Sequence, residues 1–373
     1  MRLAKLSLRQ FRNIQDLEIS PGPSLNFLVG DNAQGKTSIL ESIYFLSTLK
    51  SFRPAKLLDL TKSGFESFQV EAEISSDLKD RVQRVKVRVQ GLQKRLLVDE
   101  KPVIASKFRS NLRVVIFSPD SLAAVKYGPE LRRELIDQAF FQISTKAGDA
   151  QEEYGRALRQ RNACLKQIKN GLIDLGQGRK ILESLEPGFL RLASEVTFYR
   201  LELLDALREN VIEIISQIMG TTVNIAFAYE SDDRIWSERD YSSIQSRLER
   251  SLKDEAKRKN EEVLGLSLVG PHRHDLSFIF NNADSRIYCS QGQQRALILS
   301  FKMAEIVYHG KAFVSHPLLL LDDVLSEFDE AKRRYLVDFL SAHEAQTFLT
   351  TTDRTLILEG CPCFQIKAGK LIN

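Results

Sequence analysis

The sequence contains no run of 18 apolar residues, which excludes a helix long and apolar enough to cross a membrane. It has four cysteines, too few for the disulfide framework of a secreted chain of 373 residues. The first residues carry charge too early for the apolar core of a signal peptide, and internal repeats and low-complexity tracts are missing. These absences predict a protein of the reducing cytoplasm that has no membrane partner.

The net charge of +4 is small, but its distribution is uneven. Residues 50–113 contain 15 Lys and Arg against 8 Asp and Glu, which indicates a polyanionic partner such as nucleic acid. Arg84, Lys86 and Arg88 alternate with valines, so one face of a strand would be basic and either contact phosphates or only face solvent. The further candidates for DNA contact are Lys50, Arg53 and Lys56.

Strand and helix patterns alternate toward both ends of the chain, which predicts an α/β protein with a largely parallel sheet. Short apolar or alternating segments predict strands at residues 3–8, 15–19, 26–29, 68–74, 81–90, 94–98, 112–117, 317–321, 346–351 and 364–367. Apolar residues at helical spacing predict helices at residues 37–49, 293–309 and 330–342.

The middle of the chain has the composition of helices, rich in Leu, Glu, Arg, Lys, Gln and Ala. Glycines at several positions and Pro187-Gly188 are expected to interrupt these helices repeatedly. The longest unbroken helix would then cover residues 189–219 and reach about 45 Å. A compact helical arm is predicted, and a long coiled coil is excluded.

Residues 30–37 fit the pattern G-x-x-x-x-G-K-[ST] of a P-loop, between an apolar strand and a helix as the motif requires. Backbone N–H groups of such a loop surround phosphates at a helix N-terminus. Lys36 would contact the β and γ phosphates of ATP, and the Thr37 hydroxyl would hold Mg²⁺. The predicted nucleotide-binding residues of the loop are Gly30, Asp31, Asn32, Ala33, Gln34, Gly35, Lys36, Thr37 and Ser38.

Four leucines at residues 318–321 precede two acids, Asp322 and Asp323. A buried parallel strand that ends in a carboxylate would bring Asp322 to the metal ion bound with ATP. Asp323 would orient or activate the attacking water, and we therefore predict it as catalytic together with Lys36.

Ser290-Gln291-Gly292-Gln293 begins a predicted helix just upstream of the acidic strand, which is where an ABC-type ATPase has its signature segment. In that class Ser290, Gly292 and Gln293 would meet ATP held by a second subunit, and Ser290 would be catalytic. Residues 326–329 take the place of the D-loop. Thr352 occupies the usual position of a switch histidine, and no glutamine marks the lid element after residue 117.

With these motifs the sequence closely resembles the RecF family of SMC-like, ABC-type ATPases. The resemblance covers nearly the whole chain, with departures at Leu135 and His274. The segments that carry it are Phe11-Arg12-Asn13, the P-loop, Ser51-Phe52-Arg53, Phe117-Ser118-Pro119-Asp120, Gly128-Pro129 with Arg132-Arg133 and Asp137, Gly270-Pro271-His272-Arg273, Ser290-Gln291-Gly292-Gln293-Gln294-Arg295, and Asp322-Asp323 with residues 326–329.

The resemblance implies an ATP-dependent homodimer with weak, DNA-stimulated ATPase activity. It implies binding to double-stranded, gapped or junction DNA, and partnership with RecR and possibly RecO in loading recombinase during recombinational repair and replication. The expected architecture is an ATPase head formed by residues 1–120 and 263–373, with a mainly helical arm at residues 121–262.

Two other assemblies remain as alternatives: the ATPase subunit of a transporter, or an ATPase that works with a separate nuclease chain. The distance from Gly30 to Ser290 disfavours the transporter, because its signature segment lies much nearer the P-loop. His272, His274 and Asp275 could be metal ligands, but no further His or Cys clusters with them in the sequence.

Overall fold

The computed structural model describes residues 1–76, 79–122, 124–232, 234–313, 316–343 and 345–372. The chain forms two compact units. The head unit contains Met1–Ala123, Ile214–Thr221 and Arg295–Asn373, and the arm unit contains Ala124–Glu213 and Thr222–Gln294.

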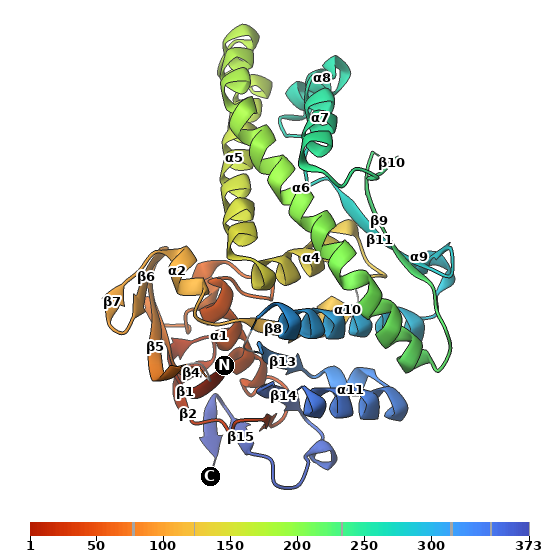
Figure 1. The fold of residues 1–373 in the computed structure, drawn as a ribbon. Coiled ribbons are helices and arrows are strands. Elements are labelled where there is room, and N and C mark those ends of the chain that lie inside the picture. The colour runs from red at the N-terminus through yellow and green to blue at the C-terminus, as the bar shows by residue number, and fades with distance from the viewer. Residues whose placement is uncertain (77–78, 123, 233, 314–315, 344, 373) are drawn as a thin grey trace. The chain divides into compact units, whose positions relative to one another are not determined.

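The centre of the head unit is a six-stranded sheet in the order β16-β15-β3-β14-β13-β8 (Figure 1). β3 (Leu25–Val29), β8 (Val114–Phe117), β13 (Leu318–Asp322), β14 (Thr347–Thr351) and β15 (Cys363–Lys367) are parallel, and only β16 (Lys370–Ile372) is antiparallel to its neighbour. The parallel sheet expected from the sequence is confirmed. α1 (Lys36–Thr48) follows β3 and is buried along almost its whole length.

The strands expected near the start of the chain do not join this parallel sheet. They form a second, antiparallel sheet in the order β2-β1-β4-β5-β6-β7. Its strands are β1 (Arg2–Phe11), β2 (Ile14–Ile19), β4 (Ser67–Ser76), β5 (Lys79–Gln90), β6 (Gln93–Val98) and β7 (Lys101–Pro102). Phe11, Phe45 and Phe68 pack between this sheet and α1, with ring centroids of Phe11 and Phe68 5.2 Å apart. Hairpin connections join β1 to β2 and join β4, β5, β6 and β7 in turn, which explains the antiparallel pairing of these strands.

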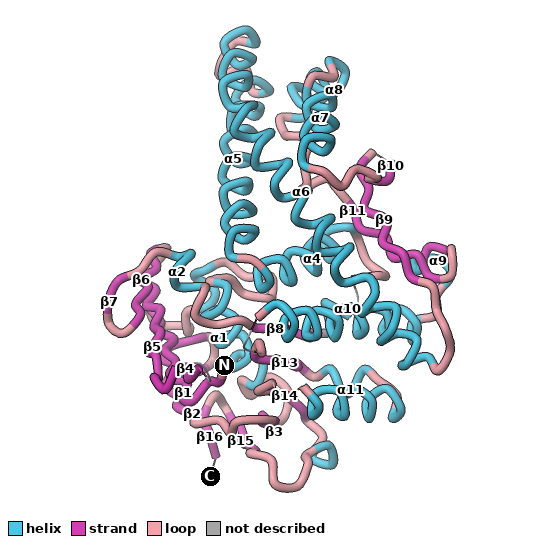
Figure 2. Tube along the Cα trace, in the orientation of Figure 1, coloured by secondary structure: helices cyan, strands magenta, loops and turns pink. Residues whose placement is uncertain are grey.

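Shorter elements and two further helices complete the head unit (Figure 2). They are η1 (Leu57–Leu60), α2 (Ala105–Arg109), α3 (Pro119–Leu122), η2 (Val324–Glu327), α11 (Glu330–Ala342), η3 (Arg354–Leu356) and most of α10 (Gln291–Ala312). No helix of the described part of the chain is long and apolar enough to cross a membrane.

The arm unit combines long helices with a small sheet. Its helices are α4 (Pro129–Ile143), α5 (Thr145–Lys169), α6 (Leu175–Met219, which ends in the head unit), α7 (Tyr241–Leu252), α8 (Glu255–Leu264) and α9 (Ser285–Tyr288). The sheet has the order β10-β9-β11-β12, formed by β9 (Ile225–Ser231), β10 (Arg234–Ile235), β11 (Asp275–Phe280) and β12 (Ala283–Asp284).

The expected helix break at Pro187-Gly188 is wrong, because α6 is one helix of 45 residues that contains Pro187. At 1.5 Å per residue it is about 68 Å long. A proline in a helix interior costs about 3 kcal/mol or more. Burial of Leu182, Phe189 and Leu192 on both sides of the proline offsets this local cost.

The glycines of the long helices were also expected to be breaks, and most are not. Gly148 and Gly155 lie inside α5, and Gly178 lies inside α6. A Cβ atom at Gly178 would lie 2.4 Å from a side-chain carbon of Ile168 in α5. Gly178 therefore permits the close approach of α5 and α6.

The two units divide at Arg295, about 30 residues later than the expected boundary at 263. The reason is strand pairing: β11 pairs with β9 over six residue pairs, from Asp275 opposite Glu230 to Phe280 opposite Ile225. Backbone hydrogen bonds therefore keep residues 275–280 in the arm unit.

Candidate functional site

A cleft of about 650 Å³ opens in the head unit at the carboxyl ends of β3, β8, β13 and β14. In a parallel sheet this edge is where ligands bind. The cleft is lined by Arg12, Asn13, Asn32, Ala33, Gln34, Gly35, Lys36, Thr37, Ser38, Phe52, Arg53, Asp59, Thr61, Ser118, Pro119, Asp120, Asp322, Asp323 and Thr350.

The P-loop is held by close backbone contacts to the hairpin of β15 and β16. A Cβ atom at Gly30 would lie 2.3 Å from the carbonyl oxygen of Ile366, so only glycine fits there. The Gln34 side chain accepts a hydrogen bond of 2.6 Å from the N–H of Ala368, and its carbonyl accepts one of 2.8 Å from the N–H of Gly369. The hairpin turn thereby holds the P-loop at Gly30 and Gln34.

Lys36 begins α1, and its side chain turns back over the loop. Its ammonium donates to the carbonyl oxygens of Gly30 (2.5 Å) and Asp31 (2.8 Å). Burial lowers the pKa of Lys36, and the negative charges of Asp323, Asp322 and Asp31 oppose that shift. A partly desolvated ammonium at a helix start is suited to bind an anion such as the phosphates of a nucleotide.

Thr37 and Asp322 lie together although 285 positions separate them in the chain. The Thr37 hydroxyl donates to Oδ1 of Asp322 at 2.7 Å, and the Thr350 hydroxyl donates to the same atom at 3.0 Å. Burial raises the pKa of Asp322, and the hydrogen bonds from Thr37 and Thr350 oppose the shift. A buried carboxylate beside a hydroxyl is a donor set that fits Mg²⁺, because hard oxygen ligands suit that ion.

Asp323 follows the strand in the left-handed region, with φ of 52°. Its N–H donates to the Thr350 hydroxyl at 2.8 Å, so Thr350 fixes both acidic residues. Burial raises the pKa of Asp323, and the charge of Lys36 opposes the rise. A carboxylate with a raised pKa at the cleft wall is suited to orient water or to accept a proton.

Several residues of the cleft have a role that no sequence motif predicts. Arg12 forms a two-pronged ion pair with Glu41, at 2.8 Å from Nε and 2.6 Å from a terminal nitrogen, and the Glu41 side chain is fully buried. Asn13 accepts a hydrogen bond from the Ser38 hydroxyl at 3.0 Å and donates to the Ala33 carbonyl at 3.3 Å. From the turn between β1 and β2, Asn13 thus contacts the P-loop and Arg12 contacts α1.

Ser118, Pro119 and Asp120 line the cleft directly after β8, which runs parallel to β13 with Phe117 opposite Leu321. They lie in the segment after residue 117, where the sequence has no lid glutamine. The rule that functional residues follow the carboxyl ends of parallel strands could have indicated them. Thr352, expected near a switch histidine's position, is exposed and is not among the residues that line the cleft.

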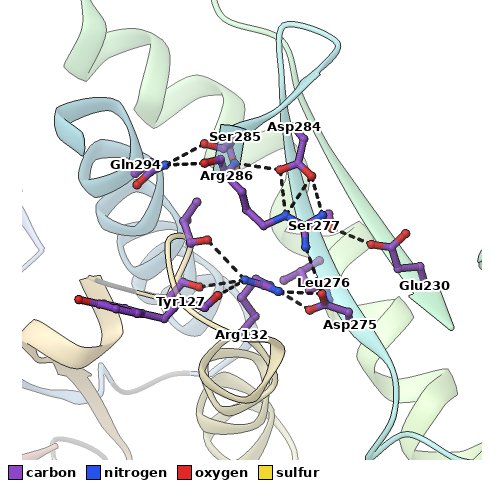
Figure 3. A network of polar contacts seen from close by, with 12 residues as sticks. Tyr127, Arg132, Glu230, Asp275, Leu276, Ser277, Asp284, Ser285, Arg286 and Gln294 are labelled. Carbon is purple, nitrogen blue, oxygen red and sulfur yellow. Dashed lines mark hydrogen bonds and ion pairs between the residues drawn. The ribbon is translucent and has the colours of Figure 1, made fainter. Parts of the chain in front are cut away.

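The signature segment lies in the arm unit, beside a network of polar contacts (Figure 3). Arg132 of α4, which is 2% exposed, forms a two-pronged ion pair with Asp275, at 2.9 and 2.7 Å. Arg286 of α9 contacts both Asp275 and Asp284. The amide of Gln294 donates to the Ser285 carbonyl at 2.9 Å, which ties the first turn of α10 to α9.

Ser290 and Gln293 form a reciprocal cap at the start of α10. The N–H of Ser290 donates to Oε1 of Gln293 at 2.8 Å, and the N–H of Gln293 donates to the Ser290 hydroxyl at 3.3 Å. Gly292 is exposed, and a Cβ atom there would meet only Ser290 Oγ, at 4.0 Å. Ile287 and Tyr288, just before the segment, are 71% and 73% exposed.

The pattern of the RecF/RecN/SMC N terminal domain family matches residues 2–370. A DNA replication and repair protein RecF from Geobacter sp. (strain M21) is 34% identical over the full length of both chains. One from Anaeromyxobacter sp. (strain Fw109-5) is 38% identical over 96% of this chain and 94% of its own. The chain belongs to the RecF family.

Solved structures agree with membership of the RecF family. A structure of the recombination mediator protein RecF with ATPrS has a TM-score of 0.87 at 27% identity, over 99% of this chain and 97% of that chain. The Smc head domain from Pyrococcus furiosus has a TM-score of 0.56 at 16% identity, over 99% of this chain and 95% of that chain. The second likeness shows a shared fold, an α/β ATPase head with a helical insertion.

The basic strand of this RecF family chain is not a free basic face. Arg84 pairs with Glu73 at 2.9 Å, and Lys86 pairs with Glu71 at 3.3 Å and with Glu100 at 2.6 Å. The neighbouring β4 contributes glutamates to the same face, so Arg84 and Lys86 are neutralised within the sheet, whereas Arg88 bonds the neutral Gln69 side chain at 2.7 Å. The contacts support the solvent-facing alternative for Arg84 and Lys86. Of the other candidates, Arg53 lines the nucleotide cleft, 3.8 Å from Glu41.

His272 and His274 form hydrogen bonds with other residues of the arm unit. His272 Nδ1 is 2.6 Å from the Tyr154 hydroxyl and its Nε2 is 3.0 Å from the Ser267 carbonyl. His274 Nδ1 is 3.0 Å from the Tyr229 hydroxyl. Burial lowers the pKa of His272 to about 4 and lowers that of His274 as well. The described residues contain no group of three or more acidic, histidine or cysteine side chains that could hold a metal ion.

Proposed function

We propose that this chain is an ATP-dependent mediator of recombinational DNA repair and replication in the cytoplasm. It binds double-stranded or gapped DNA and works with RecR and RecO to load recombinase on single-stranded DNA. The full-length RecF relatives support this role. The observation that carries it is the cleft in which Lys36, Thr37 and Asp322 lie together.

ATP is the proposed ligand of that cleft. Residues 30–38 would surround its phosphates with backbone N–H groups, and Lys36 would exchange its two loop carbonyls for phosphate oxygens. Mg²⁺, when bound with ATP, would neutralise phosphate charge. Thr37 and Asp322 are the oxygen ligands available for it, and Thr350 would keep the Asp322 carboxylate in position.

We propose a weak ATPase activity that DNA stimulates, and that releases the protein from DNA. Asp323 would orient the attacking water from the cleft wall, held there by the bond between its N–H and Thr350. Lys36 would stabilise negative charge that grows on the phosphate oxygens. Asp323 and Lys36 together would not complete the site, because a signature segment must still approach the γ-phosphate.

The missing part would come from a second copy of the chain, bound in an ATP-dependent homodimer. Ser290, Gly292 and Gln293 stand at the exposed start of α10, where N–H groups and a hydroxyl can face a partner's γ-phosphate. The exposed Ile287 and Tyr288 beside them support an interface at this place, since large apolar side chains rarely remain in water together.

The experiment that tests the proposal is light scattering coupled to size exclusion, with and without ATP and duplex DNA. Ser290→Arg should keep ATP affinity but lose dimerisation and hydrolysis, because the cation obstructs the helix start. Ser290→Gly is the matched control for dimerisation alone, since it leaves the helix start unobstructed and glycine at this cap costs only a few tenths of a kcal/mol. Dimerisation by the arginine variant equal to that of the wild type would refute the signature assignment.

Mixing Ser290→Arg with Lys36→Ala makes the test sharper. In the mixed dimer one site combines an intact P-loop with an intact signature segment, and the other site has neither. ATP-dependent association that appears only in the mixture would support the shared site. Association by Lys36→Ala alone would contradict the role of Lys36 in holding the phosphates.

A further inference from the structure

A second cleft, of about 590 Å³, lies wholly within the arm unit. The hairpin of β9 and β10, the helices α7 and α8 and the segment 268–274 form its walls. We call it the arm cleft. Its lining residues are Ser231, Asp232, Arg234, Ile235, Trp236, Glu238, Arg247, Leu248, Arg250, Ser251, Asp254, Lys257, Leu268, Val269, Gly270, Arg273 and His274.

The carboxylates of the arm cleft already have partners. Glu238 pairs with Arg247 at 2.8 Å, and Asp232 pairs with Lys257. Asp254 caps the start of α8, where it accepts hydrogen bonds from the N–H groups of residues 256 and 257 at 2.9 and 3.2 Å. Glu238 and Asp232 are therefore each paired with a cation, and only Asp254 leaves its negative charge to offset the remaining cations of the lining.

Three exposed arginines of the arm cleft have no carboxylate partner among the residues that the structure describes. Arg250 bonds only the Ser246 carbonyl of its own helix, at 3.3 Å. Arg273 bonds the Ser267 carbonyl through Nε, also at 3.3 Å. Arg234 offers its whole guanidinium group. The lining contains five Lys and Arg against three Asp and Glu, a surplus of two positive charges, which suits an anionic ligand.

The shape and the apolar part of the cleft restrict which anion fits. Ile235 is 62% exposed at the rim, and Leu268 is half-buried in the wall. Trp236 is 1% exposed, and the Arg247 guanidinium carbon lies over its ring, 4.0 Å from the ring centroid. The described lining therefore offers no open aromatic face for stacking a base of single-stranded DNA, and a duplex is too wide for a concavity of this size.

We propose that the arm cleft binds an acidic peptide segment of a partner protein. Its carboxylates would pair with Arg234, Arg250 and Arg273, and one apolar side chain would pack on Ile235 and Leu268. Arginine is suited to this role because its planar fork matches a carboxylate. The site is separate from the proposed ATP and DNA functions, and it would let the arm recruit a partner by charge and by one apolar contact.

The test uses the full-length chain and a fluorescein-labelled peptide in which aspartates flank one leucine. Anisotropy should show saturable binding that weakens by about tenfold or more in Arg250→Glu with Arg273→Glu. The matched control reverses Arg156 and Arg159, two exposed arginines of α5, and should bind as the wild type does. Arg250→Glu alone checks the result without touching the segment 268–274.

Two further measurements separate the peptide from other anions. Ile235→Ser should weaken the peptide with leucine but not the same peptide with glycine in its place. A labelled single-stranded oligonucleotide should be insensitive to the arm-cleft variant. The proposal is overturned if the wild type does not bind the peptide, if the α5 control loses binding equally, or if the oligonucleotide alone depends on Arg250 and Arg273.

Discussion

Glu41 is the buried carboxylate on which the wall of the nucleotide cleft depends. It accepts two hydrogen bonds from Arg12 and one of 2.5 Å from the Ser51 hydroxyl, with its side chain fully buried. Glu41→Gln keeps the shape but removes the charge, and leaves the Arg12 guanidinium without its counter-ion. Removing one partner of a buried pair costs about 3–5 kcal/mol.

The Arg12 side chain is 18% exposed and keeps its bond to the Asp59 carbonyl, so water and that oxygen recover part of the loss. We therefore expect Glu41→Gln to lower the free energy of unfolding of the head unit by about 2–3 kcal/mol. A fluorescent ATP analogue should also bind more weakly, because Arg12 and residues 51–53 border the cleft.

The assay is urea unfolding followed by far-ultraviolet circular dichroism. The single tryptophan, Trp236, belongs to the arm unit, so its fluorescence reports on that unit separately. Glu18→Gln is the control, since Glu18 forms an exposed ion pair with Lys5 and its loss should change little. Equal midpoints for the two variants would refute the reasoning. Arg12→Met combined with Glu41→Leu should recover stability, because an apolar pair leaves no buried charge.

Three further expectations follow from the described contacts. Asp323→Asn should bind ATP without turnover and accumulate the dimer, and wild-type turnover in a phosphate-release assay would contradict its role. Gly369→Val should weaken binding of an ATP analogue by about tenfold, because its Cβ would lie 2.7 Å from the Asn13 carbonyl oxygen. Gly360→Val is its control, with a similar φ and open space around it. The arm unit should lose stability from pH 6.5 toward pH 4, because His272 has a pKa of about 4 when folded and takes up a proton only on unfolding. His272→Gln should flatten that dependence of the Trp236 unfolding midpoint, and an unchanged slope would contradict the assignment.

The P-loop residues and Asp322 belong to continuous strings in the sequence. The P-loop and the strand that ends at Asp322 each need only neighbouring residues to be recognised, and the structure brings them together. Thr350 could not be found this way, because its contact with Asp322 depends on the pairing of β13 with β14. Asn13 and the turn at Gly369 were missed for the same reason, since they meet the P-loop from strands at opposite ends of the chain.

Two further features depend on tertiary contacts that a local rule does not contain. The net charge of the strand face that carries Arg84 depends on glutamates of the neighbouring β4. The sequence of β5 alone does not contain these glutamates. Proline has a low helix propensity, which predicts a break at Pro187. The apolar side chains on both sides of Pro187 are buried in a helix that continues through it. A prediction made from one segment does not include contacts with segments that are distant in the chain.

The order of strands in the central sheet sets the sequence of events when the chain folds. β3 is synthesised early, but both of its neighbours, β14 and β15, are made after nearly all of the remaining residues. The arm unit lies almost wholly between them, and its β9–β11 pairing is complete before β14 exists. Closing so long a connection is entropically costly and slow, so the arm should become structured while β3 still lacks both partners. During synthesis the apolar strand β3 would remain exposed to chaperones and aggregation, and nucleotide affinity should appear last.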